Sequence, residues 1–186
     1  MREEIETGVE DANAAAPETA AETPAIQALS EVLPLLRTEQ NLVMGALAGS
    51  VAALVGAAIW AVVTVASERQ IGYMALGVGV LVGFAVRIFG KGIDPVFGYL
   101  GGALAFVGCL AGNVLSGCGF IANSRGMPIL DVVSQLNFEV AWAVLSAMSS
   151  PMDLLFYGLA IYEGNRFAIR QVTAEEIEAV RQGAAL

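Results

Sequence analysis

The sequence predicts an all-α membrane protein, a small polytopic transmembrane helical bundle with Gly-rich packing and about four membrane-embedded helices. Hydrophobic residues make up 56% of the 186 residues and charged residues only 15%, whereas soluble domains average about 25% charged residues. Residues 40–67, 70–86 and 95–124 carry no charge, and a helix of ~20 apolar residues is long enough to cross the bilayer core. Sixteen of the 21 glycines lie between Gly45 and Gly119, which suits close helix packing in lipid.

Residues 1–39 are expected to form a disordered acidic N-terminal tail. They hold nine of the 18 acidic residues and only two arginines, and such a composition buries too little apolar surface to fold. Apolar residues between Ile26 and Leu36 recur at near-helical spacing, so a short amphipathic segment at the membrane surface is the alternative, although Pro34 would interrupt it. The tail lacks the basic flank and apolar core of a secretory signal.

The bundle is predicted over residues 40–170, and its first two spans cover about 41–66 and 71–89. Only Ser67–Gln70 joins these two spans, so the second helix must return antiparallel to the first. The sequence from Gly90 to Ile93 is expected to turn the chain again.

The third span is predicted over about 95–116. Asp94 is a suitable N-cap residue, and Pro95 suits the first helical position. Gly117 and Gly119, on either side of Cys118, are expected to mark the fraying end of this helix.

An amphipathic segment at about 127–139 and a fourth span at about 140–162 are predicted to follow. Ser150, Pro151 and Asp153 form a helix-start signature, with a cap, a proline and an acid in the first turn. In one arrangement a single Pro-kinked helix crosses the membrane. In the other, two shorter helices form a membrane-associated hairpin around residues 149–151. A crossing is preferred because it returns the C-terminus to the side with more basic residues.

A short polar C-terminal helix and tail are predicted over residues 171–186, because Thr173 and Glu176 have the spacing of a capping box. Four crossings with the N-terminus inside place most basic residues on the inner side, which is the bias of cytoplasmic loops. Both termini are therefore expected to be cytoplasmic. The inner set is Arg37, Arg87, Lys91, Arg166, Arg170 and Arg181, against Arg69 and Arg125 outside.

Composition also excludes several classes of function. The chain has no histidine, so His-dependent metal sites and catalytic triads are excluded. Its net charge of −9 argues against nucleic-acid binding. Cys109 and Cys118 would lie ~13 Å apart on one helix, too far for a mutual disulfide. We expect no catalytic residue, metal ligand or cofactor site.

Two polar residues at membrane depth are the candidate functional residues. Ionisable and polar groups there are costly and often mark a transport path or a proton relay. Asp153 also has an ordinary role available, which is to cap the helix that Pro151 starts. Asn113 is also suited to a hydrogen bond between helices.

Four glycine pairs have the G-x-x-x-G spacing that lets helices approach closely in lipid. The preferred interpretation is packing within the chain, and the alternative is a seam between copies in a homo-oligomer. The pairs are Gly45/Gly49, Gly79/Gly83, Gly98/Gly102 and Gly108/Gly112.

Two segments carry a family resemblance. The run GYMALGVGVLVGFAVRIFGKG from Gly72, preceded by Trp60, and the run PMDLLFYGLAIYE from Pro151 resemble a family of uncharacterised bacterial multi-pass inner-membrane proteins. The resemblance covers about residues 41–170 and implies a location in the bacterial inner membrane. It implies no activity, so it assigns no functional residue.

The leading hypothesis is a non-enzymatic membrane protein that scaffolds, anchors or assists a partner. Polar tails on a compact bundle and the lack of catalytic motifs motivate it. The alternative is a permease for a small solute or an ion, working as an oligomer with Asp153 and Asn113 along its path. Expected partners are the lipid bilayer and either further copies or another membrane protein.

Overall fold

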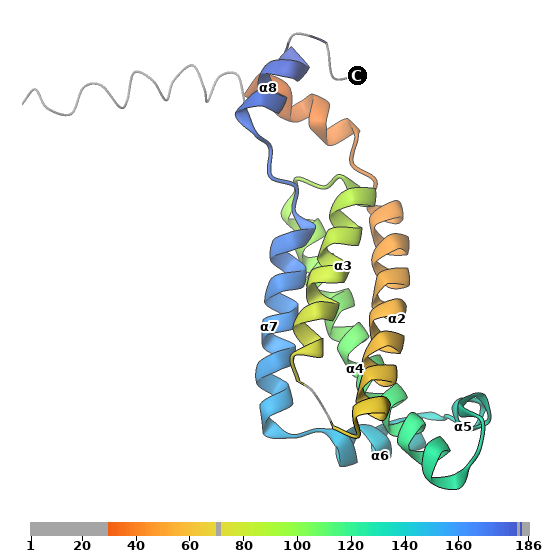
Figure 1. Cartoon of the computed structure of the whole chain (residues 1–186). Coiled ribbons are helices and arrows are strands. Elements are labelled where there is room, and N and C mark those ends of the chain that lie inside the picture. Colours follow the sequence, from red (N-terminus) through yellow and green to blue (C-terminus); the bar gives the residue numbers. More distant parts are fainter. Residues whose placement is uncertain (1–29, 70–71, 182, 184–186) are drawn as a thin grey trace, which may run out of the picture. The chain divides into compact units, whose positions relative to one another are not determined.

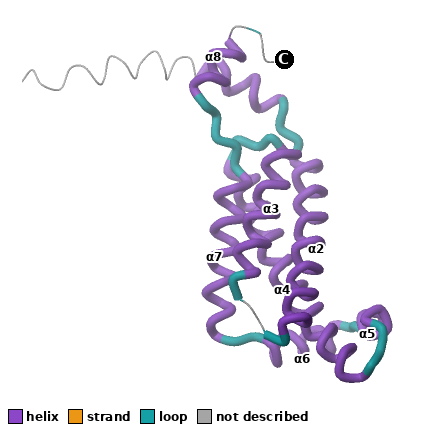
Figure 2. Tube along the Cα trace, viewed as in Figure 1, coloured by secondary structure: helices purple, strands orange, loops and turns teal. Residues whose placement is uncertain are grey.

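In the computed structural model, residues 30–69, 72–181 and 183 are described. Every regular element among them is a helix, which confirms the all-α fold class (Figure 2). Residues 30–38 are helical, and the further helices are α2 (Leu42–Ser67), α3 (Met74–Gly90), α4 (Pro95–Arg125), α5 (Ile129–Ser134), α6 (Phe138–Met148), α7 (Pro151–Ala168) and α8 (Ala174–Arg181). The chain divides into a bundle unit, Glu39–Gln171, and a terminal unit made of Met1–Thr38 and Val172–Leu186.

Four helices, α2, α3, α4 and α7, run side by side along the bundle unit (Figure 1). The amide of Asn41, before α2, donates to the carbonyl of Gly90 at the end of α3, at 2.9 Å. At the opposite end the rings of Tyr73, before α3, and Phe156, in the second turn of α7, lie 5.3 Å apart. The chain therefore traverses the bundle four times, with α2 and α4 antiparallel to α3 and α7.

Two of these helices are each long and apolar enough to cross a membrane. They are α2, with 26 residues, and α4, with 31 residues, and the bent pair of α6 and α7 is a third candidate if it counts as one broken span. Helix α3 has 17 residues and covers about 26 Å, slightly less than the ~30 Å hydrocarbon core. Two to three candidate spans agree with a membrane protein, while four spans remain a prediction.

The paired glycines lie where helices approach closely within the chain. A Cβ on Gly45 would lie 3.2 Å from the Cα of Gly90, and one on Gly83 would lie 2.7 Å from the Cβ of Phe167. A Cβ on Gly79 would overlap the backbone carbonyl of Ala160. The other glycines of the four pairs also face neighbouring helices, namely Gly49, Gly98, Gly102, Gly108 and Gly112. All eight therefore serve packing within this chain.

Helix α4 is longer than predicted. It continues through the predicted fraying end at Gly117 and stops only at Gly126, whose φ of 63° is left-handed. Gly117 faces Val144 of α6, and Gly119 faces Val65 of α2. These glycines are packing positions inside a helix, so treating them as a helix terminus was wrong.

The predicted fourth span, 140–162, is not one helix. Helices α6 and α7 meet at a bend of 105°, which fits a broken span or a re-entrant loop, and α7 by itself runs along the bundle beside α3 and α4. Ser150 and Asp153 form a capping box that starts α7 afresh, with Pro151 in its first turn. A proline lacks the amide needed to continue α6. The helix that begins at Pro151 therefore ends at Ala168, beyond the predicted end of the fourth span at residue 162.

The predicted amphipathic segment at 127–139 covers α5 and only the start of α6. Asn137 caps α6 by accepting from the amide of Val140 at 2.8 Å. Phe138 and Trp142, one turn apart on α6, are 83% and 63% exposed. Exposed aromatic residues on a short helix across the bundle end are typical of the membrane interface.

The described end of the predicted disordered tail over 1–39 forms a helix. Residues 30–38 are helical through Pro34, and Val32 and Leu36 are buried on one face. The rest of the predicted tail, 1–29, lies outside the described residues. At the other end of the chain, Thr173 accepts from the amide of Glu176 at 3.3 Å, which confirms this half of the predicted capping box before α8.

Gly79→Ala should destabilise the bundle by about 1–3 kcal/mol, because the added methyl group meets backbone of Ala160 that cannot rotate away. The matched control is Gly77→Ala on the same helix, where an added Cβ meets nothing within 4 Å. Thermal unfolding in a mild detergent should show a lower Tm for the first variant. The second should match the wild type or exceed it slightly. Equal Tm values would contradict the packing role.

Candidate functional site

Asn113 and Tyr157 form a hydrogen bond inside the bundle. The side-chain Nδ2 of Asn113, on α4, donates to the hydroxyl of Tyr157, on α7. Asn113 is fully buried and Tyr157 nearly so. Nearby on α4, the Ser116 hydroxyl donates to the carbonyl of Gly112 at 2.7 Å. Asn113 therefore has the interhelical role expected for a buried amide in a membrane bundle.

Asp153 lies at the start of α7, not at its centre. Its carboxylate Oδ2 accepts from the amide of Ser150 at 2.7 Å, and the Ser150 side chain accepts in return from the amide of Asp153. Asp153 is 5% exposed. The side chains of Asp153 and Tyr157 share a helix face, because they are four residues apart. The structure thus places both candidate polar residues on one side of the interior and gives each a structural bond.

Two further polar atoms are buried in the same half of the bundle. Trp60 Nε1 and Thr64 Oγ1, one turn apart on α2, have no hydrogen-bond partner among the described residues. The ring of Trp60 packs on Gly112, where an added Cβ would lie 3.0 Å from it. Burying such a large ring offsets the cost of its unpaired N–H.

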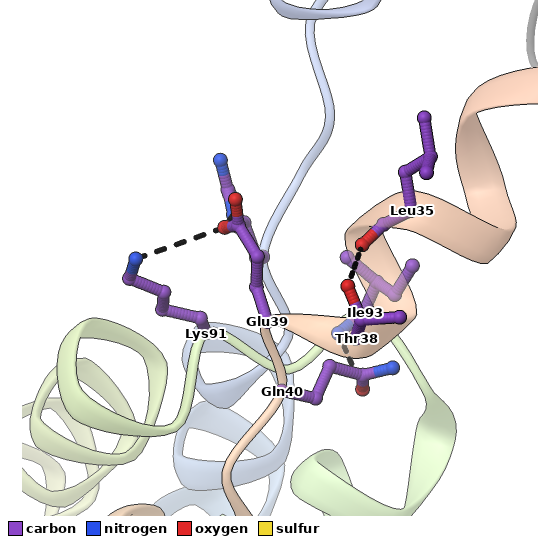
Figure 3. Close-up of polar contacts among 7 residues, drawn as sticks. Leu35, Thr38, Glu39, Gln40, Lys91 and Ile93 are labelled. Atoms are coloured by element: carbon purple, nitrogen blue, oxygen red, sulfur yellow. Dashed lines mark hydrogen bonds and ion pairs between the residues drawn. The ribbon is translucent and has the colours of Figure 1, made fainter. Parts of the chain in front are cut away.

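A second polar cluster ties three segments together at the end of the bundle where the chain enters and leaves it. We call it the collar and define it as Glu39, Gln40, Lys91, Asp94 and Arg170. Glu39 Oε2 lies 3.7 Å from Lys91 Nζ and 3.5 Å from Arg170 Nη1. Figure 3 shows Glu39 and Lys91 facing each other across this end of the bundle.

Gln40 joins the start of α2 to the turn between α3 and α4. Its Oε1 accepts from the amides of Ile93 at 3.2 Å and Asp94 at 3.3 Å, and its Nε2 donates to Asp94 Oδ2 at 2.9 Å. Asp94 occupies the N-cap position of α4 as predicted, but its side chain makes no capping hydrogen bond there. Its carboxylate is instead part of the collar.

Backbone hydrogen bonds complete the collar. The amide of Arg170, beyond the end of α7, donates to the carbonyl of Gly92 at 2.8 Å. Lys91 adopts a left-handed φ of 49°, an unfavourable conformation for a residue with a Cβ. The predicted turn over Gly90–Ile93 is confirmed, although Lys91 rather than a glycine takes this conformation. The collar thus fixes where the chain enters α2 and leaves α7.

No local pattern in the sequence predicts the collar as a unit. The sequence predicts Asp94 as a helix cap and Lys91 and Arg170 only as basic residues of the inner side, because Glu39 and Arg170 are 131 residues apart. Among residues 30–69 and 72–181, no group of three or more acidic, Cys or His side chains is placed to hold a metal ion. Both polar clusters make hydrogen bonds and ion pairs that position helices.

Comparison with protein-family models, curated proteins and solved structures gave no match. The resemblance to a bacterial inner-membrane family therefore remains a prediction.

Tyr157→Phe should cost about 1–3 kcal/mol, because it removes the acceptor of a buried amide. Asn113→Leu should be destabilising as well. The double variant should cost less than the sum of the two, by about 1 kcal/mol, since the residues share one interaction. Chemical unfolding in mixed micelles gives these values. Tyr162→Phe, at an exposed position on α7, is the control, and additive costs would contradict the pairing.

Proposed function

We propose that the protein is a non-enzymatic, multi-pass protein of the bacterial inner membrane that anchors its terminal unit at the membrane surface and there scaffolds or assists a partner. The observation that supports this most is that the two ends of the chain, 30–38 and α8, belong to one compact unit. A chain whose two ends fold together must have both ends on one side of the membrane.

The charge distribution supports the proposal. The terminal unit holds 11 acidic and three basic residues, a formal charge of −8, while the bundle unit holds seven acidic and six basic residues, a charge of −1. Anionic headgroups repel an acidic unit, which keeps it available to a soluble partner. A complementary partner surface is basic.

Four crossings with both termini in the cytoplasm suit this arrangement. If the two ends of the chain fold together, the number of membrane crossings must be even. The chain traverses the bundle four times, in α2, α3, α4 and α7, which is an even number. The collar end then carries Lys91 and Arg170 on the cytoplasmic side, in agreement with the bias of basic residues. The opposite end carries Arg69 and Arg125.

A permease has less support. Its proposed path would use Asp153 and Asn113, but Asp153 caps α7 and Asn113 binds Tyr157. The glycine contacts bring α3 and α7 together over the backbone of Ala160, which favours a filled interior over an open path. Both observations favour the scaffold.

Reversing charge on the terminal unit should release the partner. Glu31 and Glu175 are exposed, so Glu31→Lys with Glu175→Lys should lower recovery of a basic partner by at least about tenfold through like-charge repulsion. The measurement is quantitative mass spectrometry of the full chain purified from native membranes in mild detergent.

The matched control is Glu68→Lys with Glu139→Lys, which reverses two exposed acids of the bundle unit. This control should retain the partner. Equal recovery from both double variants, or no stoichiometric partner with the wild type, would contradict the proposal.

A further inference from the structure

A groove of about 540 Å³ lies along the C-terminal halves of α2 and α4, beside α5. Its volume is within the range of small-molecule sites, about 300–1,000 Å³. Its walls are almost entirely apolar, and Asn123 is the polar side chain among them. The helices that form its walls, α2 and α4, are the two long and apolar enough to span a membrane. In a bilayer, the groove would therefore open toward acyl chains.

One end of the groove lies nearer the middle of α2, and we call it the deep end. The other lies at the C-terminal ends of α2 and α4, and we call it the shallow end. On α2 the groove extends from Ala58 to Ala66, which is about 12 Å of helix. The shallow end reaches Asn123 and Met127, next to the C-terminus of α4 at Arg125. The groove thus extends from apolar helix to the helix ends, where headgroups would lie.

Two arginines come directly after the groove-lining segments of α2 and α4, at the shallow end. Arg69, after α2, and Arg125, at the end of α4, are exposed. Neither forms an ion pair within the described part of the chain. The acids at this end form no ion pair with either arginine in the described part of the chain. They are Glu68, Asp131 and Glu139, which are exposed, and Asp153, which is in the capping box of α7. Arginine recognises phosphate through planar, paired hydrogen bonds.

We propose that this groove binds one acyl chain of an anionic phospholipid, with the lipid phosphate held by Arg125 and Arg69. The groove is apolar at its deep end and has arginines at its shallow end. A phospholipid likewise has an apolar acyl chain at one end and a charged phosphate at the other. Basic pockets beside transmembrane helices recognise anionic headgroups in this way. The site depends on α2 and α4 crossing the bilayer, and it does not depend on a protein partner of the terminal unit.

A second protein helix fits the groove less well than a lipid. Its ~12 Å length along α2 offers only about two turns of contact. Packing between membrane helices relies on small residues over a longer face. The cationic end would also face no complementary charge on an apolar helix.

Native mass spectrometry of the delipidated full chain in a mild detergent tests the proposal. The probes are dioleoylphosphatidylglycerol, dioleoylphosphatidylcholine and inorganic phosphate, each titrated separately. We expect one retained phosphatidylglycerol, bound about tenfold more tightly than phosphatidylcholine. Both lipids carry the phosphate, but the choline cation of phosphatidylcholine is repelled by the two arginines. Arg125→Gln should remove this preference, whereas Arg87→Gln, on α3 at the opposite end, should not.

Filling the groove tests the acyl chain separately. Ala58 lines the groove and is exposed, so Ala58→Trp should fold and lower phosphatidylglycerol binding by about tenfold. Val62→Trp, at another exposed lining position, is the second variant. Ala103→Trp, an exposed position on α4 outside the groove lining, is the matched control and should bind as the wild type does.

Equal binding of the two phospholipids, or unchanged binding in both groove-filling variants, would overturn the proposal. Displacement of the lipid by inorganic phosphate, with no effect of Ala58→Trp, would also overturn it, because only a phosphate site would remain. If the wild type shows no lipid preference but its partner is recovered, this site alone is overturned. If the wild type binds the lipid but no partner is recovered, only the proposed scaffold is overturned.

Discussion

Close approach of helix backbones over glycine is the constraint on which the rest of the structure depends. Apolar side chains alone do not draw helices together in lipid, because the acyl chains are as apolar as the side chains. Here the backbone of α7 at Ala160 and Gly164 lies against Gly79 and Gly101, so dispersion contacts and polar contacts act over short distances. The interhelical bond of Asn113 also depends on this packing, since its Tyr157 partner is carried by α7.

The collar complements the packing by fixing the ends of the helices. Glu39, Lys91 and Arg170 bring together the start of α2, the turn before α4 and the end of α7. Because the chain enters and leaves the bundle at this end, the terminal segments can fold as one unit. The same geometry leaves the opposite end to α5, α6 and the groove between α2 and α4. The two ends of the bundle thus differ, one held by the ion pairs of the collar and the other proposed to hold lipid.

Sequence alone predicted the features that depend on local pattern. Charge-free stretches located α2 and α3 and the start of α4, and the Ser150–Asp153 signature located the start of α7. Prediction from sequence was wrong or incomplete where contacts between helices far apart in the sequence determine the structure. Gly117 has the appearance of a helix end, yet its missing side chain admits Val144 of α6. The collar was missed because Gln40 binds Asp94 across 54 residues, and no local pattern indicates such a pair.

The central claim, that the chain traverses the bundle four times and returns both ends to one side, is best tested by the sidedness of single cysteines. With Cys109 and Cys118 replaced by Ala, Thr38→Cys, Gln171→Cys and Ser124→Cys each introduce one exposed thiol. An impermeant maleimide is applied to spheroplasts and to inverted vesicles. We predict that positions 38 and 171 are labelled from the same side and position 124 from the opposite side. Labelling of 38 and 171 from opposite sides would contradict the account.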